Sequence, residues 1–257
     1  MRKKCSIITV NLNNKDGLQQ TIQSVIAQTG DEIEYLVIDG ASTDGSVDII
    51  KQYRDNIDQW ISEPDTGVYN AMNKGIDRAS GEYLLFLNSG DRLYQPNVIE
   101  KVLPELKQDL VYGDMILDHG SHEEPITYAD KLTMSYLFDW YIPHPASFIR
   151  KTLFEKVGKY EEQYPVCADW AFAMRALCLH GASYRHIKQT ITRFDMHGMS
   201  AKPENFPAIR QERDGFLNTH FSLYLDDFAE LKKLRRIPNS RTFRFFRRLG
   251  FFKRKGV

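Results

Sequence analysis

Residues 62–91, SEPDTGVYNAMNKGIDRASGEYLLFLNSGD, constrain the fold of this chain more than any other stretch. Their pattern predicts a helix over residues 68–79 and then an apolar strand over residues 82–87. Asp65 lies in the turn before the helix, and Asp91 lies just after the strand. In an open α/β sheet, ligands bind outside the carboxyl ends of the strands. A carboxylate at that edge suits a hard metal ion on a diphosphate, although an ordinary polar turn favours the same residue types.

The rest of the first half alternates in the same way between apolar strands and amphipathic helices. Strands are predicted over residues 6–10, 35–38, 59–62 and 82–87, and helices over residues 16–28, 43–53 and 68–79. This βαβαβαβ order with short connections is typical of a mostly parallel sheet covered by helices. After residue 104 the rhythm is less regular, with a short strand at residues 110–113, a polar hairpin near residues 118–124 and helices near residues 151–157 and 169–180. We expect one α/β domain over residues 1–230.

The composition excludes several classes of protein. In the 257 residues, 42% of them hydrophobic, no run approaches the roughly 18 apolar residues of a membrane span. The basic start is followed by an apolar run, residues 5–10, that is too short for a secretory signal. The three cysteines, Cys5, Cys167 and Cys178, have no CxxC spacing and argue against a disulfide framework or a zinc site. These features predict a cytoplasmic protein.

The net charge of zero hides a strong asymmetry. Residues 231–257 contain 11 Lys or Arg and no Asp or Glu, which leaves 23 basic against 34 acidic residues in the first 230. Basic segments with interspersed aromatic residues bind anionic membrane surfaces, where each cation contributes roughly 1 kcal/mol. RNA binding and docking on the acidic body are the alternatives. We expect the tail to bind an anionic membrane and expect no nucleic-acid partner.

Two common ways of holding phosphates are absent from the sequence. A dinucleotide-binding enzyme would place G-x-G-x-x-G directly after the first strand, but that position reads VNLNNKDG. The P-loop pattern G-x-x-x-x-G-K-[ST] is also missing. The remaining solution is a metal ion that is held by carboxylates and bridges the phosphates.

Three segments in order, SIITVNLNNKDGL, YLVIDGASTDGS and ISEPDTGVYNAMNKGIDRASGEYLLFLNSGD, resemble the nucleotide-site segments of family 2 glycosyltransferases. The resemblance implies the GT-A fold, a Rossmann-like sheet flanked by helices, and inverting transfer from a nucleotide sugar. The wording EPDTGVYNAMNKG…FLNSGD is similar to the bacterial subgroup that builds capsule, O-antigen and other surface polysaccharides. The resemblance covers residues 5–95 and, more loosely, residues 144–154 and 167–176. It implies a nucleotide-sugar-binding half over residues 1–104 and an acceptor-facing half over residues 105–230.

The resemblance also implies a donor site at the ends of the first strands. Its expected members are Thr9, Asn11, Asp39, Asp65, Lys74, Asn88, Ser89 and Asp91. Thr9 and Asn11 would line the nucleoside pocket, and Asp39 would accept a hydrogen bond from the base, which suits uracil and so favours a UDP-sugar. Asp65 would face the nucleoside side of the donor. Lys74 would contact a phosphate or remain a solvated helix lysine.

The chain departs from the family at the metal triplet. The usual Asp-x-Asp, often Asp-Ser-Asp-Asp, reads Asn88-Ser89-Gly90-Asp91 here, so Asp91 alone keeps a carboxylate. One carboxylate can still hold Mg²⁺ or Mn²⁺ when phosphate oxygens and waters complete the shell. His144 and His197 are candidate further ligands, and a structural role is the alternative for each.

The catalytic base is expected in the second half. Inverting transfer needs a group that takes the proton from the acceptor hydroxyl as it attacks the sugar. Asp169 begins a predicted helix, where it would serve as a plain N-cap or, as the resemblance to the family's base motif implies, as that base. Trp170 would floor the acceptor pocket or fill the core.

The sequence therefore predicts an inverting glycosyltransferase that uses a nucleotide sugar, with UDP favoured, and a glycan acceptor that is lipid-linked at the inner face of the cell membrane. One alternative is a degenerate, non-catalytic transferase that scaffolds a polysaccharide complex. The other is a sugar nucleotidyltransferase, which would require a Gly-rich signature with a lysine after the first strand, and none is present.

Overall fold

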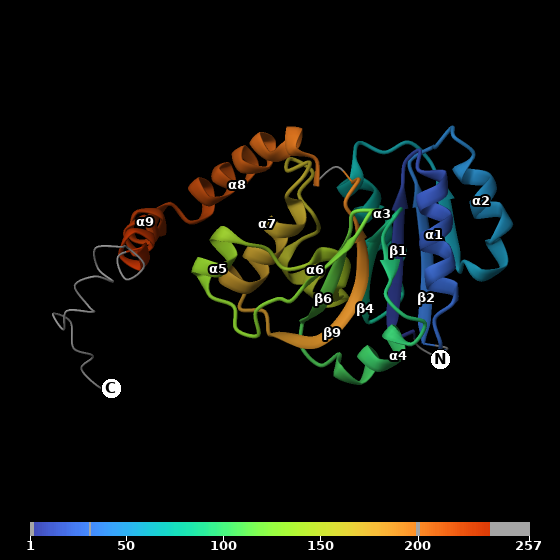
Figure 1. The fold of residues 1–257 in the computed structure, drawn as a ribbon, viewed down its shortest axis with the longest axis horizontal. Helices are drawn as coiled ribbons and strands as arrows, with labels where there is room; N and C mark the ends of the chain where they lie inside the picture. The colour runs from blue at the N-terminus through green and yellow to red at the C-terminus, as the bar shows by residue number, and fades with distance from the viewer. Residues whose placement is uncertain (1–2, 31, 199–200, 237–257) are drawn as a thin grey trace. The chain divides into compact units, whose positions relative to one another are not determined.

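The computed structural model describes residues 3–30, 32–198 and 201–236 of the chain (Figure 1). These residues form two compact units, one up to residue 209 and one from residue 210, and each is described by itself. Most of the predicted membrane-binding tail, residues 237–257, lies outside the described residues. Within the described residues, no helix is both long enough and apolar enough to cross a membrane.

Nine strands of the described residues form one sheet in the order β3-β2-β1-β4-β8-β6-β9-β5, with β7 paired to β6. The strands are β1 (Cys5–Asn11), β2 (Ile33–Asp39), β3 (Gln59–Ser62), β4 (Tyr83–Asn88), β5 (Arg92–Leu93), β6 (Leu110–Asp118), β7 (Glu123–Ile126), β8 (Ser147–Arg150) and β9 (Tyr184–Asp195). The helices are α1 (Lys15–Ile26), α2 (Ser46–Gln52), α3 (Val68–Arg78), α4 (Val98–Val102), α5 (Met134–Asp139), α6 (Lys151–Val157), α7 (Ala168–Met174), α8 (Phe206–His220) and α9 (Ser222–Arg236).

The first half of the sheet is parallel, as the sequence predicts. β1 pairs in parallel with β2 and with β4, and β2 pairs in parallel with β3, so that these strands end at one edge. The register sets Asn11 opposite Asp39 and Asp39 opposite Ser62, while Val10 lies opposite Asn88. The predicted α/β fold and the order of its first strands and helices are confirmed. Figure 1 shows β1, β2 and β4 side by side with α1 packed across them.

The second half joins this sheet through antiparallel pairing. β8 lies between β4 and β6 and is antiparallel to both. β6 and β7 form the predicted hairpin, and β6 pairs in parallel with the long strand β9. β9 ends at Asp195, next to the end of β6 at Asp118. The second half of the sequence therefore delivers carboxylates close to the turn that follows β4, where β5 also pairs with β9.

Close packing of the helices fixes the central strands. Every residue of β1 is buried, because helices cover both faces of a central parallel strand. On α3, Gly75 allows the helix to approach β1: an added Cβ would lie 2.5 Å from Ile8 Cγ2. α1 buries Leu18, Ile22 and Val25 in the helical spacing that the sequence predicts.

Candidate active site

The end of β2 carries a fully buried carboxylate in a dense hydrogen-bond network. Asp39 Oδ1 accepts hydrogen bonds from Asn11 Nδ2 at 2.7 Å and from Ser42 Oγ at 2.6 Å. Its Oδ2 accepts from Ser42 N at 2.9 Å and from Ser62 Oγ at 2.6 Å. Burial alone would raise the pKa of Asp39, but these hydrogen bonds outweigh it and lower the pKa. The ionised carboxylate of Asp39 thus links the ends of β1, β2 and β3 through hydrogen bonds.

The same network leaves one acceptor unused. Asn11 is 3% exposed and donates from Nδ2 to Asp39, while its Oδ1 has no hydrogen-bond partner among the described residues. A buried amide oxygen without a donor is costly. Asn11 therefore keeps one acceptor in reserve at the strand edge where the sequence predicts the nucleoside, and its contact with the nucleoside stays a prediction.

Thr9 has a different environment from the one predicted. It is fully buried within β1, and its hydroxyl accepts a hydrogen bond from Tyr35 on the neighbouring strand at 3.1 Å. The side chain of Thr9 is therefore part of the core, and its contact with the nucleoside stays a prediction.

The loop before α3 lies against the loop after β2. Asp65 packs over Gly40, where an added Cβ would lie 2.4 Å from Asp65 Oδ2, and Asp65 Oδ1 accepts from Gly67 N at 2.9 Å. Lys74 reaches back to this loop and donates to Pro64 O at 2.7 Å. It also pairs with Glu63 at 3.0 Å. The structure brings Asp65 to the Asp39 loop, while the phosphate role of Lys74 stays a prediction.

The turn after β4 is built around Asp91, which is 2% exposed. Its Oδ2 accepts from Asn88 N at 3.2 Å and its Oδ1 accepts from Asp195 N at 3.0 Å. Burial raises the pKa of Asp91 to about 7, against the lowering effect of these backbone hydrogen bonds. Both carboxylate oxygens of Asp91 accept hydrogen bonds from backbone N–H groups, so Asp91 links the end of β9 to this turn. Its role as a metal ligand stays a prediction.

Asn88 and Ser89 hold the other side of this turn. Ser89 O accepts from Asn14 Nδ2 at 2.9 Å, which joins the turn to the start of α1. Asn88 Oδ1 is buried with no hydrogen-bond partner among the described residues. Asn88 is the residue that replaces the first aspartate of the family's triplet.

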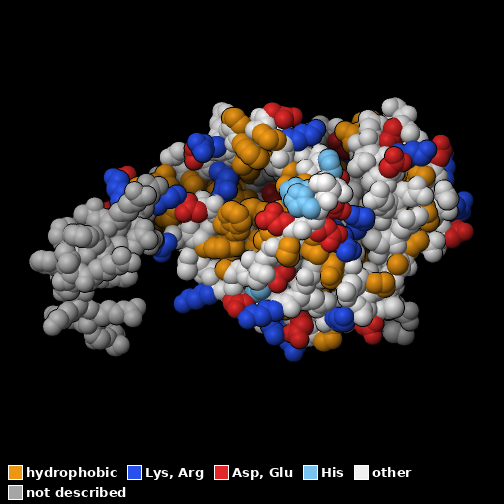
Figure 2. Space-filling model, viewed as in Figure 1, with side chains coloured by type: hydrophobic (Ala, Val, Ile, Leu, Met, Phe, Trp, Pro, Cys, Tyr) orange, Lys and Arg blue, Asp and Glu red, His pale blue; other side chains and the backbone are white. Residues whose placement is uncertain are grey.

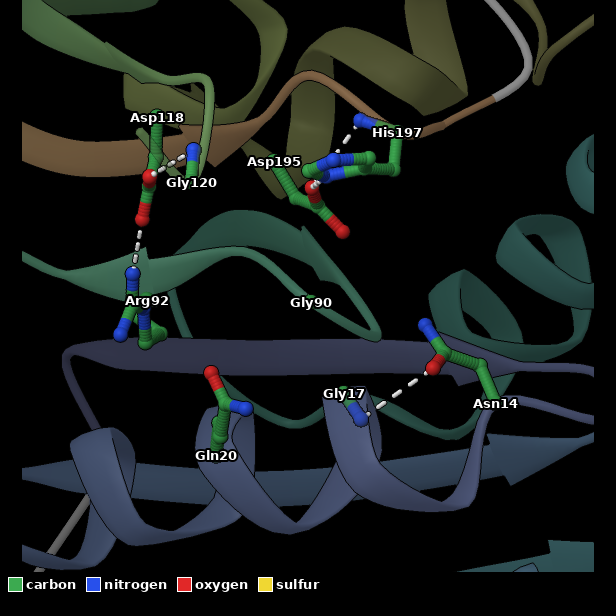
Figure 3. Close-up of a pocket in the computed structure, with 9 residues that line it drawn as sticks. All are labelled: Asn14, Gly17, Gln20, Gly90, Arg92, Asp118, Gly120, Asp195 and His197. Carbon is green, nitrogen blue, oxygen red and sulfur yellow. Dashed lines mark hydrogen bonds and ion pairs between the residues drawn. The ribbon is translucent and has the colours of Figure 1, made fainter. Parts of the chain in front are cut away.

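A cavity of about 320 Å³ opens beside this turn (Figure 3). Its lining consists of Asn14, Gly17, Gln20, Gly90, Arg92, Asp118, Gly120, Asp195 and His197. Figure 3 shows Asp195 and His197 together on one wall above Gly90, and an ion pair between Arg92 and Asp118 on another. In Figure 2, histidine and acidic side chains gather at the middle of the face in view.

Asp195 occupies the space that a side chain at position 90 would need. An added Cβ on Gly90 would lie 2.6 Å from Asp195 Oδ2, and Gly90 has φ +109°, a conformation that L side chains rarely adopt. Asp195 Oδ1 accepts from His197 N at 3.0 Å and pairs with His197 Nδ1 at 2.7 Å. The glycine that breaks the Asp-x-Asp triplet thus makes room for a carboxylate from β9.

Asp195, Arg92 and Asp118 were not predicted as site residues. Asp195 lies far along the chain from Gly90 and meets it only through the pairing of β9 with β5 and β6. The one sequence feature that could have indicated them is the glycine within the triplet, because a metal site that lacks one carboxylate needs a ligand from another part of the chain. His197 of the predicted candidates does lie here.

A metal ion at this cavity would need ligands from the substrate or from water in addition to protein side chains. Among the described residues, no group of three or more His, Cys, Asp or Glu side chains is arranged to hold a metal ion. Asp195 and His197 offer a carboxylate oxygen and an imidazole nitrogen, and a carboxylate hydrogen-bonded to one ring nitrogen orients the other toward a metal. This pair fits Mg²⁺ or Mn²⁺ when diphosphate oxygens and waters supply the rest of the shell.

Asp169 lies in the first turn of α7, as the sequence predicts. Its Oδ1 accepts from the hydroxyl of Tyr69 on α3 at 2.7 Å. A small cavity of about 20 Å³ is lined in part by Asp169, His144 and Phe172. Trp170, beside it, is 5% exposed and donates from Nε1 to Leu137 O at 2.9 Å, so its ring fills the core.

His144 belongs to this second region and not to the lining of the cavity at Gly90. Its Nε2 is 2.9 Å from the hydroxyl of Tyr160, and its ring stacks on Phe86 with centroids 5.2 Å apart. Burial lowers the pKa of His144, against the raising effect of the charge on Asp169. These contacts favour the structural alternative for His144, and its role as a metal ligand stays a prediction.

Comparison with known proteins decides the family. The family model described as glycosyl transferase family 2 matches residues 6–175. The chain belongs to this family. It is 33% identical over 201 residues to a PGL/p-HBAD biosynthesis glycosyltransferase of Mycobacterium bovis, with 75% of this chain and 77% of the relative covered. It is 37% identical over 102 residues to a putative teichuronic acid biosynthesis glycosyltransferase of Bacillus subtilis, with 38% and 40% covered.

Solved structures show the same fold. The structure of S. aureus TarS in complex with UDP-GlcNAc matches with a TM-score of 0.64 and 20% identity, covering 91% of this chain and 78% of that one. A mannosyltransferase from Pyrobaculum calidifontis in complex with GDP-Man and Mn²⁺ matches with a TM-score of 0.56 and 13% identity, covering 96% and 83%. The chain is a glycosyltransferase with a GT-A-type fold, and its relatives act in the biosynthesis of bacterial cell-surface glycans.

Proposed function

We propose that the chain transfers a sugar from a UDP-sugar to a hydroxyl of a surface-glycan acceptor, with inversion at the anomeric carbon. The observation that carries the donor assignment is the buried, unpartnered Oδ1 of Asn11, held in place by Asp39. It lies at the carboxyl edge of the parallel strands, which is the position where open α/β sheets bind ligands.

The chemistry of Asn11 favours a base with a ring N–H. Uracil offers N3–H to a carbonyl acceptor, as thymine does with N3–H and guanine with N1–H, whereas cytosine offers an unprotonated N3 and would leave the Asn11 oxygen without a donor. A site that leaves a buried polar group unpaired rejects the wrong ligand strongly. The complexes of TarS with UDP and with UDP-GlcNAc support the same donor class.

Asp195 and His197 would hold Mg²⁺ or Mn²⁺ beside the diphosphate. When bound, the ion neutralises the charge of the leaving diphosphate. Asp91 fixes the backbone of Asp195 from below, so that the carboxylate of Asp195 keeps its place over Gly90. Direct coordination of the ion by Asp91, as the sequence predicts, is the alternative, and a metal-binding measurement on Asp91→Asn would test it.

Asp169 performs the proton transfer. The acceptor hydroxyl gives its proton to an Asp169 oxygen while its own oxygen forms the bond to the anomeric carbon from the face opposite the diphosphate. The bond between that carbon and the phosphate oxygen breaks, and its electron pair leaves with UDP. General-base catalysis of this kind contributes about 10²–10⁴-fold in rate.

The first test is thermal stabilisation of the purified protein by UDP, GDP and dTDP, each with and without Mn²⁺. A ligand present at 100 times its dissociation constant adds about 2.7 kcal/mol to stability. We expect stabilisation by UDP that increases with Mn²⁺. Stabilisation by GDP alone would overturn the donor assignment. No stabilisation by any nucleotide would favour the non-catalytic scaffold.

We further propose that the acceptor is lipid-linked and that residues 231–257 hold the enzyme to an anionic membrane at the cytoplasmic face. Of these residues, 231–236 form the end of α9, and the remainder lies outside the described residues. The support is the run of 11 basic and no acidic residues with interspersed phenylalanines. Full-length protein should sediment with vesicles that contain phosphatidylglycerol and not with phosphatidylcholine vesicles, and deletion of residues 231–257 should abolish the difference. Equal sedimentation after the deletion would refute this assignment.

A further inference from the structure

Helix α3 turns three polar side chains toward the segment that leads to Asp169. Tyr69, Asn70 and Asn73 belong to the motif GVYNAMNKG, and all three contact residues between 160 and 169. Asn73 is four residues from Tyr69 and three from Asn70, so its side chain lies next to both on the helix surface. The motif therefore joins the donor loop, which ends where α3 begins, to the part of the chain that carries the catalytic base.

The contacts of the two asparagines fix this segment. Asn73 Nδ2 donates to Tyr160 O at 2.9 Å, and Asn73 Oδ1 accepts from Tyr160 N at 3.1 Å, so one side chain satisfies both backbone groups of one residue. Asn70 Nδ2 donates to the carboxylate of Glu162 at 3.1 Å, which also accepts from Thr66 Oγ1 at 3.1 Å. The segment is thereby held to α3 ahead of Asp169.

Tyr69 makes a direct hydrogen bond from α3 to the base itself. Its hydroxyl lies 2.7 Å from Asp169 Oδ1 and 2.9 Å from Val166 O. A hydroxyl has one hydrogen to donate and can accept as well. Two acceptors thus compete for one hydrogen, and the stronger is the ionised carboxylate. Tyr69 is 6% exposed, so water does not take the place of either partner.

We propose that Tyr69 is a positioning residue for the general base: its hydroxyl donates to Asp169 Oδ1 and so orients the carboxylate, which leaves the other oxygen to take the acceptor proton. This inference rests on the proposed role of Asp169. It assigns to the GVYNAMNKG motif a task on the acceptor side of the reaction, in addition to its place beside the donor loop.

The proton transfer is balanced and needs no further group. Before transfer, the Tyr69 hydroxyl donates to Asp169 Oδ1, which leaves the other carboxylate oxygen to receive the proton of the acceptor hydroxyl. After transfer, the proton lies on that other oxygen, and the Tyr69 hydroxyl keeps Asp169 Oδ1 and Val166 O as its acceptors. No proton leaves Tyr69, because burial and the nearby charge of Asp169 raise the pKa of Tyr69 well above its usual value.

Among the described residues, three titratable groups interact with the charge of Asp169. They are Tyr69 on α3, His144 in the segment before β8 and Tyr160 in the segment before α7. Burial raises the pKa of Tyr160 well above its usual value and lowers that of His144, so both are neutral near pH 7. The side chain of Tyr69 hydrogen-bonds directly to the carboxylate, at 2.7 Å.

The test compares Tyr69→Phe with Tyr160→Phe. Both substitutions remove one phenol hydroxyl from the same aromatic cluster, where the two rings lie 5.4 Å apart. The Tyr160 hydroxyl bonds with His144 and makes no direct hydrogen bond to Asp169 among the described residues, so Tyr160→Phe controls for the loss of a buried hydroxyl. The measured quantities are UDP affinity with Mn²⁺, UDP release from UDP-GlcNAc against pH with water as acceptor, and the titration of ¹³C-labelled aspartate carboxyls by NMR, with the Asp169 signal assigned from Asp169→Asn.

We expect Tyr69→Phe to move the acidic limb of the rate profile, and with it the titration of the Asp169 carboxyl, to higher pH, because the ionised form loses a hydrogen bond. UDP affinity should be unchanged, and Tyr160→Phe should leave the titration in place. An unshifted Asp169 titration in Tyr69→Phe would overturn the inference, as would an equal shift in Tyr160→Phe. Full activity in Asp169→Asn would instead refute the proposed base and leave the Tyr69 contact as a structural one. The NMR titration needs no turnover, so the two failures are distinguishable.

Discussion

Gly90→Ala tests whether Asp195 binds the metal ion in place of the aspartate that the triplet lacks. The added Cβ would lie 2.6 Å from Asp195 Oδ2 and 3.2 Å from its Cβ, closer than carbon and oxygen atoms approach without a shift. The positive φ of +109° adds backbone strain, of about 1–3 kcal/mol. The carboxylate of Asp195 must move away from the turn, and with it the side of the cavity that we assign to the metal and the diphosphate.

Gly30→Ala is the matched control. Gly30 has φ +107°, nearly the value of Gly90, but an added Cβ there meets nothing within 4 Å. Both variants should therefore lose a similar 1–3 kcal/mol of stability from backbone strain, measured by urea unfolding. The difference between the two variants isolates the displacement of Asp195 from the general cost of a side chain in this conformation.

The decisive measurement is UDP binding by calorimetry with and without Mn²⁺. We expect Gly90→Ala to weaken binding in the presence of Mn²⁺ by about tenfold or more, which corresponds to about 1.4 kcal/mol, and to leave the weaker metal-free binding nearly unchanged. Gly30→Ala should bind as the wild type does under both conditions. If Gly90→Ala retained the full Mn²⁺ effect while folded, Asp195 would not be the residue that holds the ion.

Three further predictions follow from buried groups. Glu34→Gln should destabilise the protein by about 1–3 kcal/mol at pH 7. Burial opposes ionisation of Glu34, but hydrogen bonds from Ser6 and Ser80 outweigh it and lower the pKa of Glu34. The stability that ionised Glu34 contributes is therefore present above pH 4.5 and is lost as the pH falls through the pKa of Glu34 in the folded protein. Urea unfolding of both proteins at pH 7 and pH 3 should show the difference shrinking at pH 3. Asp39→Ala should weaken UDP binding with and without Mn²⁺ alike, by calorimetry, because it releases the Asn11 amide. Gly75→Ala should cost about 1–3 kcal/mol in urea unfolding, because the added Cβ would lie 2.5 Å from Ile8, and an unchanged unfolding midpoint would contradict the packing described for α3.

The parallel half of the sheet could be predicted because its local signals agree with its tertiary environment. β1 and β4 are buried on both faces, so they appear in the sequence as short, continuous apolar runs. Turn residues mark their ends, and the spacing of apolar residues in α1 matches its buried face. The positions of Asp39, Asp65 and Asp91 followed from the same reasoning, because a strand end is a local property of the chain.

β9 could not be predicted in this way. Its sequence, YRHIKQTITRFD, mixes charged and apolar residues, and only some of them are buried. It is a strand because β6 and β5 pair with it on either side. The contact between Asp195 and Gly90 depends on that pairing, and the sequence around either residue does not predict it. The roles of the predicted residues had the same limit: a strand end shows where Asp91 lies, but not that its two oxygens bind backbone amides.

The two departures from the expected site have a common physical basis. A carboxylate at position 90 would have to project from a residue with positive φ, into space that Asp195 already fills. Glycine at position 90 relieves the backbone and admits the carboxylate from β9, while Asp91 holds that strand end by its backbone. On the other side, Tyr69 and its neighbours on α3 hold the segment that carries Asp169. In both places, residues from the first half of the chain position a carboxylate from the second. If Asp195 holds the ion as we propose, the pairing of β9 supplies from the second half of the chain the carboxylate that the local motif lacks.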